Sequence, residues 1–497
     1  MVWQSIRKMC LSRIMKIRTV KFNFAMNMLL TVSNFLFPLI TFPYVSRVLN
    51  PEGTGKVAFA YSIVSYFSIL AAFGVANYGI RACAQVRDNK DKLSKTVHEI
   101  ITINIFLMVI VYALYFLIVY VVPELRVEKK LFFISGLNIL FTIIGFEWLY
   151  KGVEQYYYIT IRSLVFKLIA FFLIFLCIKS QEDYSTYAFI IIFATVGSGI
   201  VNLYNLKKVI YIKRYSGYNI RKHIQPMATF FIITIAVAFY VYVSVAMLGF
   251  VQGNTEVGYY NAAYRIKDVM VSIITALGAV LLPRLSYYVE NNMQDKFNDV
   301  IEKSMKFIFI MSLPLVFFCI IFAKPAVLIL AGPAYEGSIL PLKILSVIIF
   351  IVGVSNLTGI QMLIPLKQEK YLCYSVIFAA IINMILNIML MPHLGAVGTA
   401  ISVAIAELCI LLIQIYVLRK FSRILFSKIS YIKLLVSLSL ASVASIYLNN
   451  NINFNEVVIF LISASTFFFL YFLMLIIMKE SFIFSILNQI KNKLVKS

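Results

Sequence analysis

The stretch IITINIFLMVIVYALYFLIVYVV, residues 100–122, decides the fold class, because it carries no charged residue and is long enough to cross a bilayer as a helix. Its apolar residues do not alternate with polar ones, as they would in the strand of a membrane barrel. In lipid, a helix satisfies every backbone N–H and C=O group within its own segment. The stretch therefore predicts a transmembrane helix.

The rest of the chain repeats this pattern. Of its 497 residues, 62% are hydrophobic and only 13% are charged, whereas a soluble domain carries about 25% charged residues. The sequence predicts an all-α integral membrane protein with about fourteen transmembrane helices. We expect these helices at 22–46, 57–80, 97–122, 131–150, 159–179, 186–206, 227–250, 259–282, 304–323, 338–363, 371–391, 396–418, 429–448 and 456–478.

The distribution of Lys and Arg residues predicts the orientation. With the N-terminus in the cytoplasm, the cytoplasmic segments hold roughly four times as many Lys and Arg residues as the outer loops. Both termini are therefore expected in the cytoplasm, with the chain crossing the membrane many times. The net charge of +24 is attributed to this rule and to contact with anionic lipids, so no nucleic-acid partner is expected.

A sparse internal repeat indicates two related halves. Gly55 matches Gly258, Ala60 matches Ala263, Tyr61 matches Tyr264, and Arg81 matches Arg284. The second and eighth expected helices have the same orientation, so the repeat is parallel. Parallel repeats build two lobes around a central cavity in many transporters. The expected organisation is a basic N-terminal segment at 1–21, an N-lobe at 22–206, a cytoplasmic linker at 207–226, a C-lobe of six helices at 227–418, two added helices at 419–478, and a cytoplasmic tail at 479–497.

The sequence offers no pattern for covalent catalysis. The six cysteines form no CxxC motif, and His98, His223 and His393 lie far apart, so neither a metal site nor a disulfide framework is expected. No nucleophile–base pair is apparent and all loops are short. We therefore expect a transporter without catalytic residues, metal or cofactor, and leave coupling to protons or sodium open.

Charged residues in one expected helix mark a candidate binding site. Charges within a membrane usually face a cavity or a partner, and Arg265, Lys267 and Asp268 lie in the helix at 259–282. Arg265 and Asp268 are three residues apart and can pair on one face. The alternatives are a cationic wall for an anionic lipid head or a structural ion pair with Lys267 extended toward the interface.

Asp268 and further charged residues are candidates for gating or ion coupling. Glu147 and Lys151 are four residues apart beside Trp148, a spacing that favours either an interfacial ion pair or a gate. Glu407 lies midway along the helix at 396–418 and either couples ion movement or makes a structural hydrogen bond. Lys167 is placed similarly in its helix.

Two groups of polar residues complete the candidate site. Asn383 and Asn387 are four residues apart and can bond between helices or face a lumen. Arg47 and Lys56 flank the turn between the first two expected helices. Prolines within the first of those helices predict that it bends.

Several motifs resemble one known family. They are RVLNPEGTG at 47–55, the segment 74–81, FEWLYKG at 146–152, AGPAYE at 331–336, LKIL at 342–345 and GIQMLIPL at 359–366. In this order and spacing they resemble the RfbX/Wzx family of O-antigen and capsule repeat-unit flippases. The resemblance extends over the first twelve expected helices.

This resemblance implies the multidrug/oligosaccharidyl-lipid/polysaccharide exporter fold with a cationic central cavity. It implies an undecaprenyl-pyrophosphate-linked glycan as substrate, moved from the cytoplasmic to the outer leaflet, and the polysaccharide polymerase and assembly machinery as partners. Arg265 matches a cavity arginine, and Arg47, Lys56 and Glu147 match motif positions without an assigned role. At Lys151 the family pattern has Gln.

Three other functions stay open at this stage. A multidrug/cation antiporter of the same fold would need acidic residues in its cavity. A lipid II flippase fits the motifs less well. An integral-membrane glycosyltransferase or polymerase would need chemistry on a long outer loop, and the sequence has none.

Overall fold

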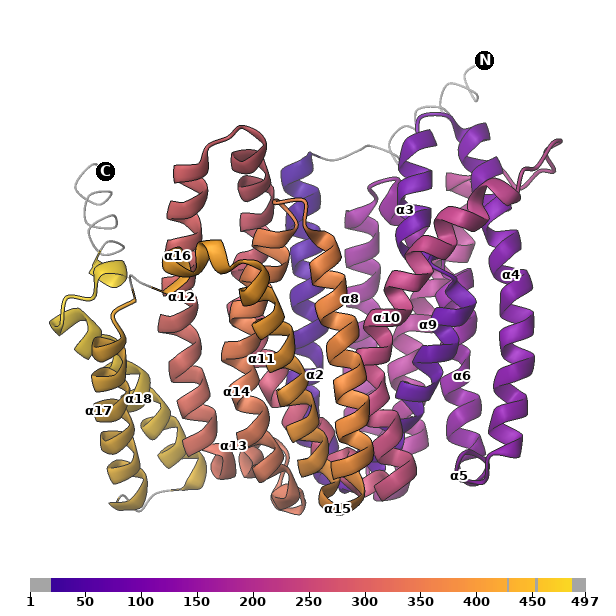
Figure 1. Ribbon diagram of the computed structural model, residues 1–497. Helices are drawn as coiled ribbons and strands as arrows, with labels where there is room; N and C mark the ends of the chain where they lie inside the picture. The colour runs from indigo at the N-terminus through magenta and orange to yellow at the C-terminus, as the bar shows by residue number, and fades with distance from the viewer. Residues whose placement is uncertain (1–18, 427–428, 452–454, 485–497) are drawn as a thin grey trace, which may run out of the picture. The chain divides into compact units, whose positions relative to one another are not determined.

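The computed structural model describes residues 19–426, 429–451 and 455–484, and all regular secondary structure in these residues is helical. The all-α prediction is confirmed, and each of the fourteen expected segments coincides with a helix over most of its length (Figure 1). The principal helices are α2 (Val20–Ala72), α3 (Val75–Val86), α4 (Lys90–Val121), α5 (Pro123–Val127), α6 (Lys129–Ile144), α7 (Glu147–Gly152), α8 (Tyr156–Cys177), α9 (Tyr184–Val209), α10 (Arg221–Gln252), α11 (Asn254–Glu290), α12 (Gln294–Ile321), α13 (Ala323–Leu330), α14 (Ile339–Asn356), α15 (Glu369–Val417), α16 (Ser422–Phe426), α17 (Tyr431–Asn451) and α18 (Glu456–Ile477).

Two of these helices turn back on themselves. The 53 residues of α2 and the 49 residues of α15 would each extend about 75 Å as straight helices, far beyond a bilayer. The chain bends at Asn50 (φ 55°, ψ 176°) and at Gly395 (φ 53°, ψ −128°). Each bend therefore separates two of the expected membrane crossings.

The bend in α15 is held by a carboxylate. The Ala396 N–H donates to Glu256 Oε2 at 2.7 Å, so an acidic side chain of α11 caps the start of the second arm. A Cβ atom on Gly395 would lie 2.4 Å from this same oxygen. Glycine is therefore required there both by the positive φ and by the close approach of Glu256.

Eleven helical stretches in the described residues are long and apolar enough to span a membrane. Two of them, Phe22–Val86 and Glu369–Val417, cover two expected segments each, and a shorter apolar helix, Ala238–Gln252, covers part of the segment at 227–250. The number of crossings stays a prediction.

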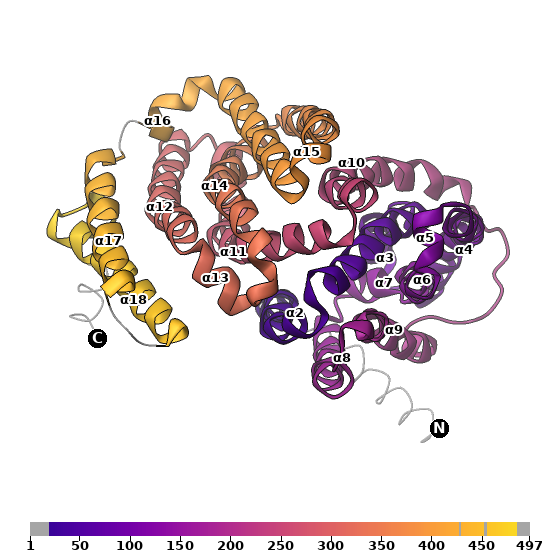
Figure 2. The same ribbon diagram turned by 90° about the horizontal axis from the view of Figure 1, so that it is seen from below.

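The chain divides into two compact units, residues 1–246 and 247–497. This division falls near the end of α10, whereas the sequence suggested a boundary in the linker at 207–226. In the second unit α17 and α18 pack beside α12 (Figure 2). The buried Tyr471 of α18 fixes this contact by donating to the Ile310 carbonyl at 3.0 Å.

The first unit brings α7 unusually close to α3. A Cβ atom on Gly79 would lie 2.5 Å from the Trp148 ring, and one on Gly152 would lie 2.7 Å from Cys83. Glycines at both contacts let the short α7 lie against α3. As a result Trp148 is 96% buried, and its indole forms one wall of the site described next.

Candidate functional site

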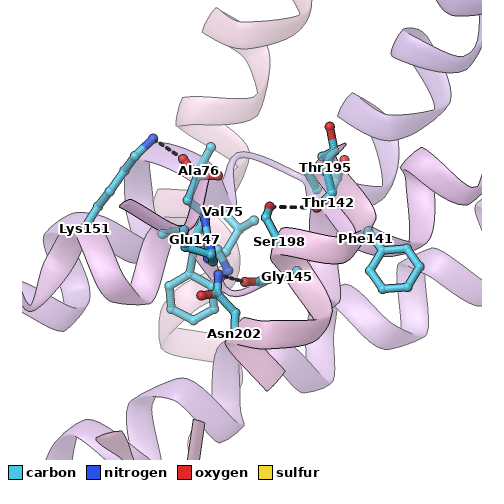
Figure 3. A pocket seen from close by; sticks show the side chains of 14 residues that line it. Val75, Ala76, Phe141, Thr142, Gly145, Glu147, Lys151, Thr195, Ser198 and Asn202 are labelled. Atoms are coloured by element: carbon cyan, nitrogen blue, oxygen red, sulfur yellow. Dashed lines mark hydrogen bonds and ion pairs between the residues drawn. The ribbon is translucent and has the colours of Figure 1, made fainter. Parts of the chain in front are cut away.

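A polar cavity of about 270 Å³ lies within the first unit. Six helices contribute to it, and Figure 3 shows the side chains of its 14 lining residues. The lining residues are Ala72, Val75, Ala76, Phe141, Thr142, Gly145, Glu147, Trp148, Lys151, Arg162, Thr195, Ser198, Gly199 and Asn202. We call this cavity the Arg162 pocket.

A break between α6 and α7 shapes the pocket. Phe146 has a left-handed backbone (φ 50°, ψ 24°), which costs a non-glycine residue on the order of 1–2 kcal/mol. The Gly145 carbonyl before it accepts a hydrogen bond from Asn202 Nδ2 of α9 at 2.5 Å (Figure 3). The break turns Glu147 and Trp148 into the pocket, so local strain is located at this site.

Glu147 and Lys151 form the ion pair that their spacing suggests. Lys151 Nζ lies 2.7 Å from Glu147 Oε1, and their side chains are 32% and 49% exposed. A pair this exposed contributes about 0–1 kcal/mol to stability. Its importance for the pocket is that the charge of Glu147 already has a partner.

Arg162 is the functional candidate that the sequence reasoning missed. The expected helix at 159–179 includes Arg162, but the residue was not singled out as a site candidate; it lies inside α8 and is only 7% exposed. Its Nε and Nη1 atoms have no hydrogen-bond partner among the described residues, while its Cζ lies 5.7 Å from the Tyr158 ring. One sequence signal existed: Arg162 stands within ITIRSLVF, where its neighbours are mostly apolar.

Two other lining residues also have polar atoms without a partner. Trp148 Nε1 and Asn202 Oδ1 are buried and make no hydrogen bond within the part of the chain that the structure describes. Three lining residues of one cavity thus have donors or an acceptor unsatisfied. Such concentrations are unusual, since buried polar groups are nearly always paired.

Lys167, a turn and a half further along α8, lies outside the pocket lining. Its Nζ donates to Ser33 Oγ at 2.7 Å and to Asn34 Oδ1 at 2.5 Å, both on the first arm of α2. The amine is therefore satisfied by neutral acceptors, and it joins α8 to α2.

The two cations at the turn in α2 have different surroundings. Arg47 is exposed and donates from Nη1 to the Pro43 carbonyl at 2.6 Å. Lys56 is largely buried between Glu52 and Glu128, at 3.1 and 3.0 Å. Two acidic partners offset the charge of Lys56, which leaves Arg47 as the more accessible cation.

The second unit gathers three of the predicted residues. Lys267 is 5% exposed, its Nζ lies 3.9 Å from the centre of the Tyr264 ring, and it pairs with Asp268 at 3.5 Å. Glu407 of α15 lies within electrostatic range of the same ammonium. The pairing of Asp268 with Arg265 stays a prediction, and the structure adds Lys267 as a partner of Asp268. Lys267 is buried rather than extended toward the interface, because the ring and the carboxylates stabilise it there.

The remaining predicted residues are Arg265, Asn383 and Asn387. Arg265 is half-buried on α11. Asn387 Nδ2 donates to Asn383 Oδ1 at 3.3 Å, and both asparagines are fully buried in the first arm of α15. The predicted residues thus fall into separate groups, two in the first unit and two in the second.

The chemistry available in these groups is ionic and hydrogen-bonding. The described residues contain no cluster of three or more His, Cys, Asp or Glu side chains that could hold a metal ion. Both units place charged and amide side chains in the interior of helical bundles, where such groups usually serve transport.

Comparison with known proteins gives consistent relatives. Proteins of Escherichia coli K12 and Shigella dysenteriae, each named "Putative O-antigen transporter", are 27% and 26% identical over 76% and 80% of this chain and 91% and 99% of their own lengths. A solved structure titled "Lipid II flippase MurJ, inward closed conformation" is 16% identical, covers 92% of this chain and 100% of its own, and superposes with a TM-score of 0.73.

That likeness shows that this chain and the solved structure share a fold. The family model described as "Polysaccharide biosynthesis protein" matches residues 20–289, more than half of the sequence. The chain belongs to this polysaccharide biosynthesis protein family.

Proposed function

We propose that this protein is a flippase that moves undecaprenyl-pyrophosphate-linked oligosaccharide units from the cytoplasmic to the outer leaflet of the bacterial inner membrane. The observation that carries the proposal is the match along nearly the whole length of two relatives named as O-antigen transporters. Family membership and a flippase-like fold support it independently. The product would serve O-antigen, capsule or exopolysaccharide synthesis.

The physical task of such a protein is to shield a charged sugar head while it crosses lipid. Burying unpaired polar groups and charges is expensive, so the head alone crosses very slowly. A protein that alternates between two accessible states removes this cost by offering polar and cationic groups to the head while the prenyl tail stays in lipid. No covalent step is required.

The proposed roles follow the surroundings of each residue. Arg265, Lys267, Arg47, Lys56, Asn383 and Asn387 are proposed to contact the head. Of these, Lys56 is the weakest candidate, because Glu52 and Glu128 already hold its ammonium.

Coupling to a proton or sodium gradient is proposed to use Asp268 and Glu407, with Glu147 and Lys151 as a gate. Asp268 and Glu407 both act on the buried Lys267, so a change in their ionisation would be felt there. Both termini are proposed to be cytoplasmic, and the polysaccharide polymerase and assembly machinery are the proposed partners.

The test is transport in proteoliposomes. Purified protein is reconstituted with a short undecaprenyl-pyrophosphate glycan, and an external glycosidase reports how fast internal glycan becomes accessible. Wild type should expose the glycan quickly and Arg265→Ala slowly, whereas Arg126→Ala, on an exposed arginine of α5, should match wild type. Unchanged transport in Arg265→Ala would remove that residue from the site. No exposure by wild type, even with an ion gradient and the native glycan, would overturn the function.

Lipid II is the second candidate substrate. The observation that favours it is the likeness to a structure titled as a lipid II flippase over 92% of this chain. The same vesicles loaded with lipid II give the comparison, and faster movement of lipid II than of the oligosaccharide would replace the first proposal.

A further inference from the structure

The Arg162 pocket contains an unbalanced charge. Among its lining residues the charged ones are Glu147, Lys151 and Arg162. Glu147 is engaged by Lys151 at 2.7 Å and also attracts Arg162, so one carboxylate faces two cations and the lining carries one positive charge in excess. Arg162 is 93% buried, and a buried charge normally has a counter-ion or a ligand.

The pocket also has hydrogen-bonding capacity in excess. Arg162 Nε and Nη1 and Trp148 Nε1 are donors without a partner, and Asn202 Oδ1 is an acceptor without one. Water could satisfy these atoms but would not balance the charge. At about 270 Å³, the pocket exceeds many times over the roughly 10–15 Å³ that one water needs.

The donor set fits an oxyanion. Three nitrogen donors without partners require acceptor oxygens, and guanidinium binds the oxygens of phosphate more strongly than neutral donors do. Asn202 Oδ1, a buried acceptor without a partner among the described residues, suits a hydroxyl on the same ligand. Hydroxyls of Thr142, Thr195 and Ser198 also line the cavity.

We infer that the Arg162 pocket is a binding site for a phosphate group that carries a sugar or glycerol hydroxyl, with Arg162 as the charged ligand and Trp148 and Asn202 beside it. This inference rests on the proposed function only for the source of the phosphate, which is the lipid-linked glycan or a membrane phospholipid. In the proposed orientation Arg162 lies two helical turns from the cytoplasmic start of α8, where either phosphate is available.

Trp148 makes the site directly observable. The chain has only two tryptophans, Trp3 and Trp148, so Trp3→Phe leaves a single fluorophore in the wall of the pocket. Inorganic pyrophosphate and a short-chain prenyl-pyrophosphate monosaccharide are titrated into this variant in detergent. Nanodiscs of phosphatidylglycerol and of phosphatidylcholine test the phospholipid source.

The inference predicts a saturable change in Trp148 emission with pyrophosphate and none with sodium chloride at equal ionic strength. Arg162→Gln should weaken binding by about tenfold or more, because it removes a charge-assisted hydrogen bond. Arg162→Lys keeps the charge and should retain part of the affinity, which separates loss of binding from loss of folding. Arg126→Gln, a matched arginine change outside the pocket, should bind as wild type does.

The source follows from which probe binds more tightly. Tighter binding of the prenyl-pyrophosphate sugar assigns the pocket to the transported head, and a response confined to phosphatidylglycerol nanodiscs assigns it to phospholipid. No saturable response, or an equal response in Arg162→Gln, overturns the inference even when transport is normal. Binding without transport would instead overturn the proposed function and leave the phosphate site standing.

Discussion

Two buried polar clusters in the first unit differ in how completely their atoms are paired. Around Glu99 of α4, which is fully buried, every polar atom has a partner. Glu99 Oε1 accepts from the Asn219 N–H at 2.8 Å, and Oε2 accepts from Lys222 at 2.7 Å and from His223 Nε2 at 2.8 Å. Tyr78 completes the cluster through His223 Nδ1 at 2.6 Å.

In the Arg162 pocket, by contrast, four polar atoms on three residues have no partner. The Glu99 cluster is neutral and closed, and it ties the start of α10 to α3 and α4. The Arg162 pocket is cationic and open to a ligand. A buried charge therefore has two uses in this fold. The Glu99 cluster stabilises the first unit, whereas the Arg162 pocket lowers its stability and leaves groups available for binding.

Removing the centre of the closed cluster should have the largest effect. Glu99→Ala leaves the buried His223 and the Asn219 N–H without their acceptor. Each buried polar group left unsatisfied costs about 1–3 kcal/mol, whereas the half-exposed Lys222 can be hydrated. We expect a large drop in the melting temperature of the purified protein in detergent. The control is Glu52→Ala, which removes one half-exposed carboxylate from Lys56. Lys56 remains paired with Glu128. Equal melting temperatures for the two variants would show that the Glu99 cluster is not a stabilising element.

A substitution in α3 can displace Trp148, which forms one wall of the Arg162 pocket. Gly79→Ala places a Cβ atom 2.5 Å from the Trp148 ring, so the ring or α7 must move, at a cost of about 1–3 kcal/mol. We expect a lower melting temperature and a changed Trp148 emission in the Trp3→Phe background. Ala84→Ser, a small change at an exposed residue of the same helix that does not line the pocket, serves as the control. Unchanged emission in Gly79→Ala would mean that α3 does not position the pocket wall.

Removing the excess charge should have the opposite sign. Arg162→Met replaces a buried guanidinium, whose burial costs free energy, by an apolar side chain of similar length, while Lys151 still pairs with Glu147. We expect a melting temperature equal to or above that of wild type, together with loss of phosphate binding. A drop as large as that of Glu99→Ala would mean that Arg162 is satisfied in the protein and that the two clusters are alike.

The sequence predicted the helices well and the polar site incompletely. Long apolar segments can cross a membrane only as helices, so their structure and order were predictable. Prolines and polar loop residues indicated most helix boundaries. The bends at Asn50 and Gly395 lie in gaps between expected helices. The sequence therefore predicted two helices in place of α2 and two in place of α15, although each pair forms one continuous element in the structure.

Tertiary contacts could not be read in the same way. Arg162 stands near the start of an expected helix, and its position along the chain gave no sign that it is buried; its burial depends on the packing of α8 against α2, α7 and α9. Lys267 was expected either in a cationic wall or extended toward the interface, but it is buried, with Asp268 beside it and Glu407 of another helix in its surroundings. The partners of a buried charge come from elements distant in sequence, which periodicity does not reveal.

The smallest expected effect concerns pH and the closed cluster. Burial lowers the pKa of His223 from its usual value near 6.5, although hydrogen bonding to Glu99 acts in the opposite direction. The charged groups facing the ring are Glu99 and Lys222, with Tyr78 at the other nitrogen. Because the folded pKa is lowered, the stability that neutral His223 contributes is complete above pH 6.5 and is lost as pH falls through the folded value.

A melting series between pH 7.5 and pH 5 should therefore show a modest decline in wild type, on the order of 1 kcal/mol or less. His223→Gln cannot titrate but can still donate to Glu99, so its melting temperature should be flatter over the same range. His393→Gln, at an exposed histidine, should decline as wild type does. A parallel decline in wild type and His223→Gln would show that the closed cluster takes up no proton in this range, and its stability would then rest on Glu99 and Lys222 alone.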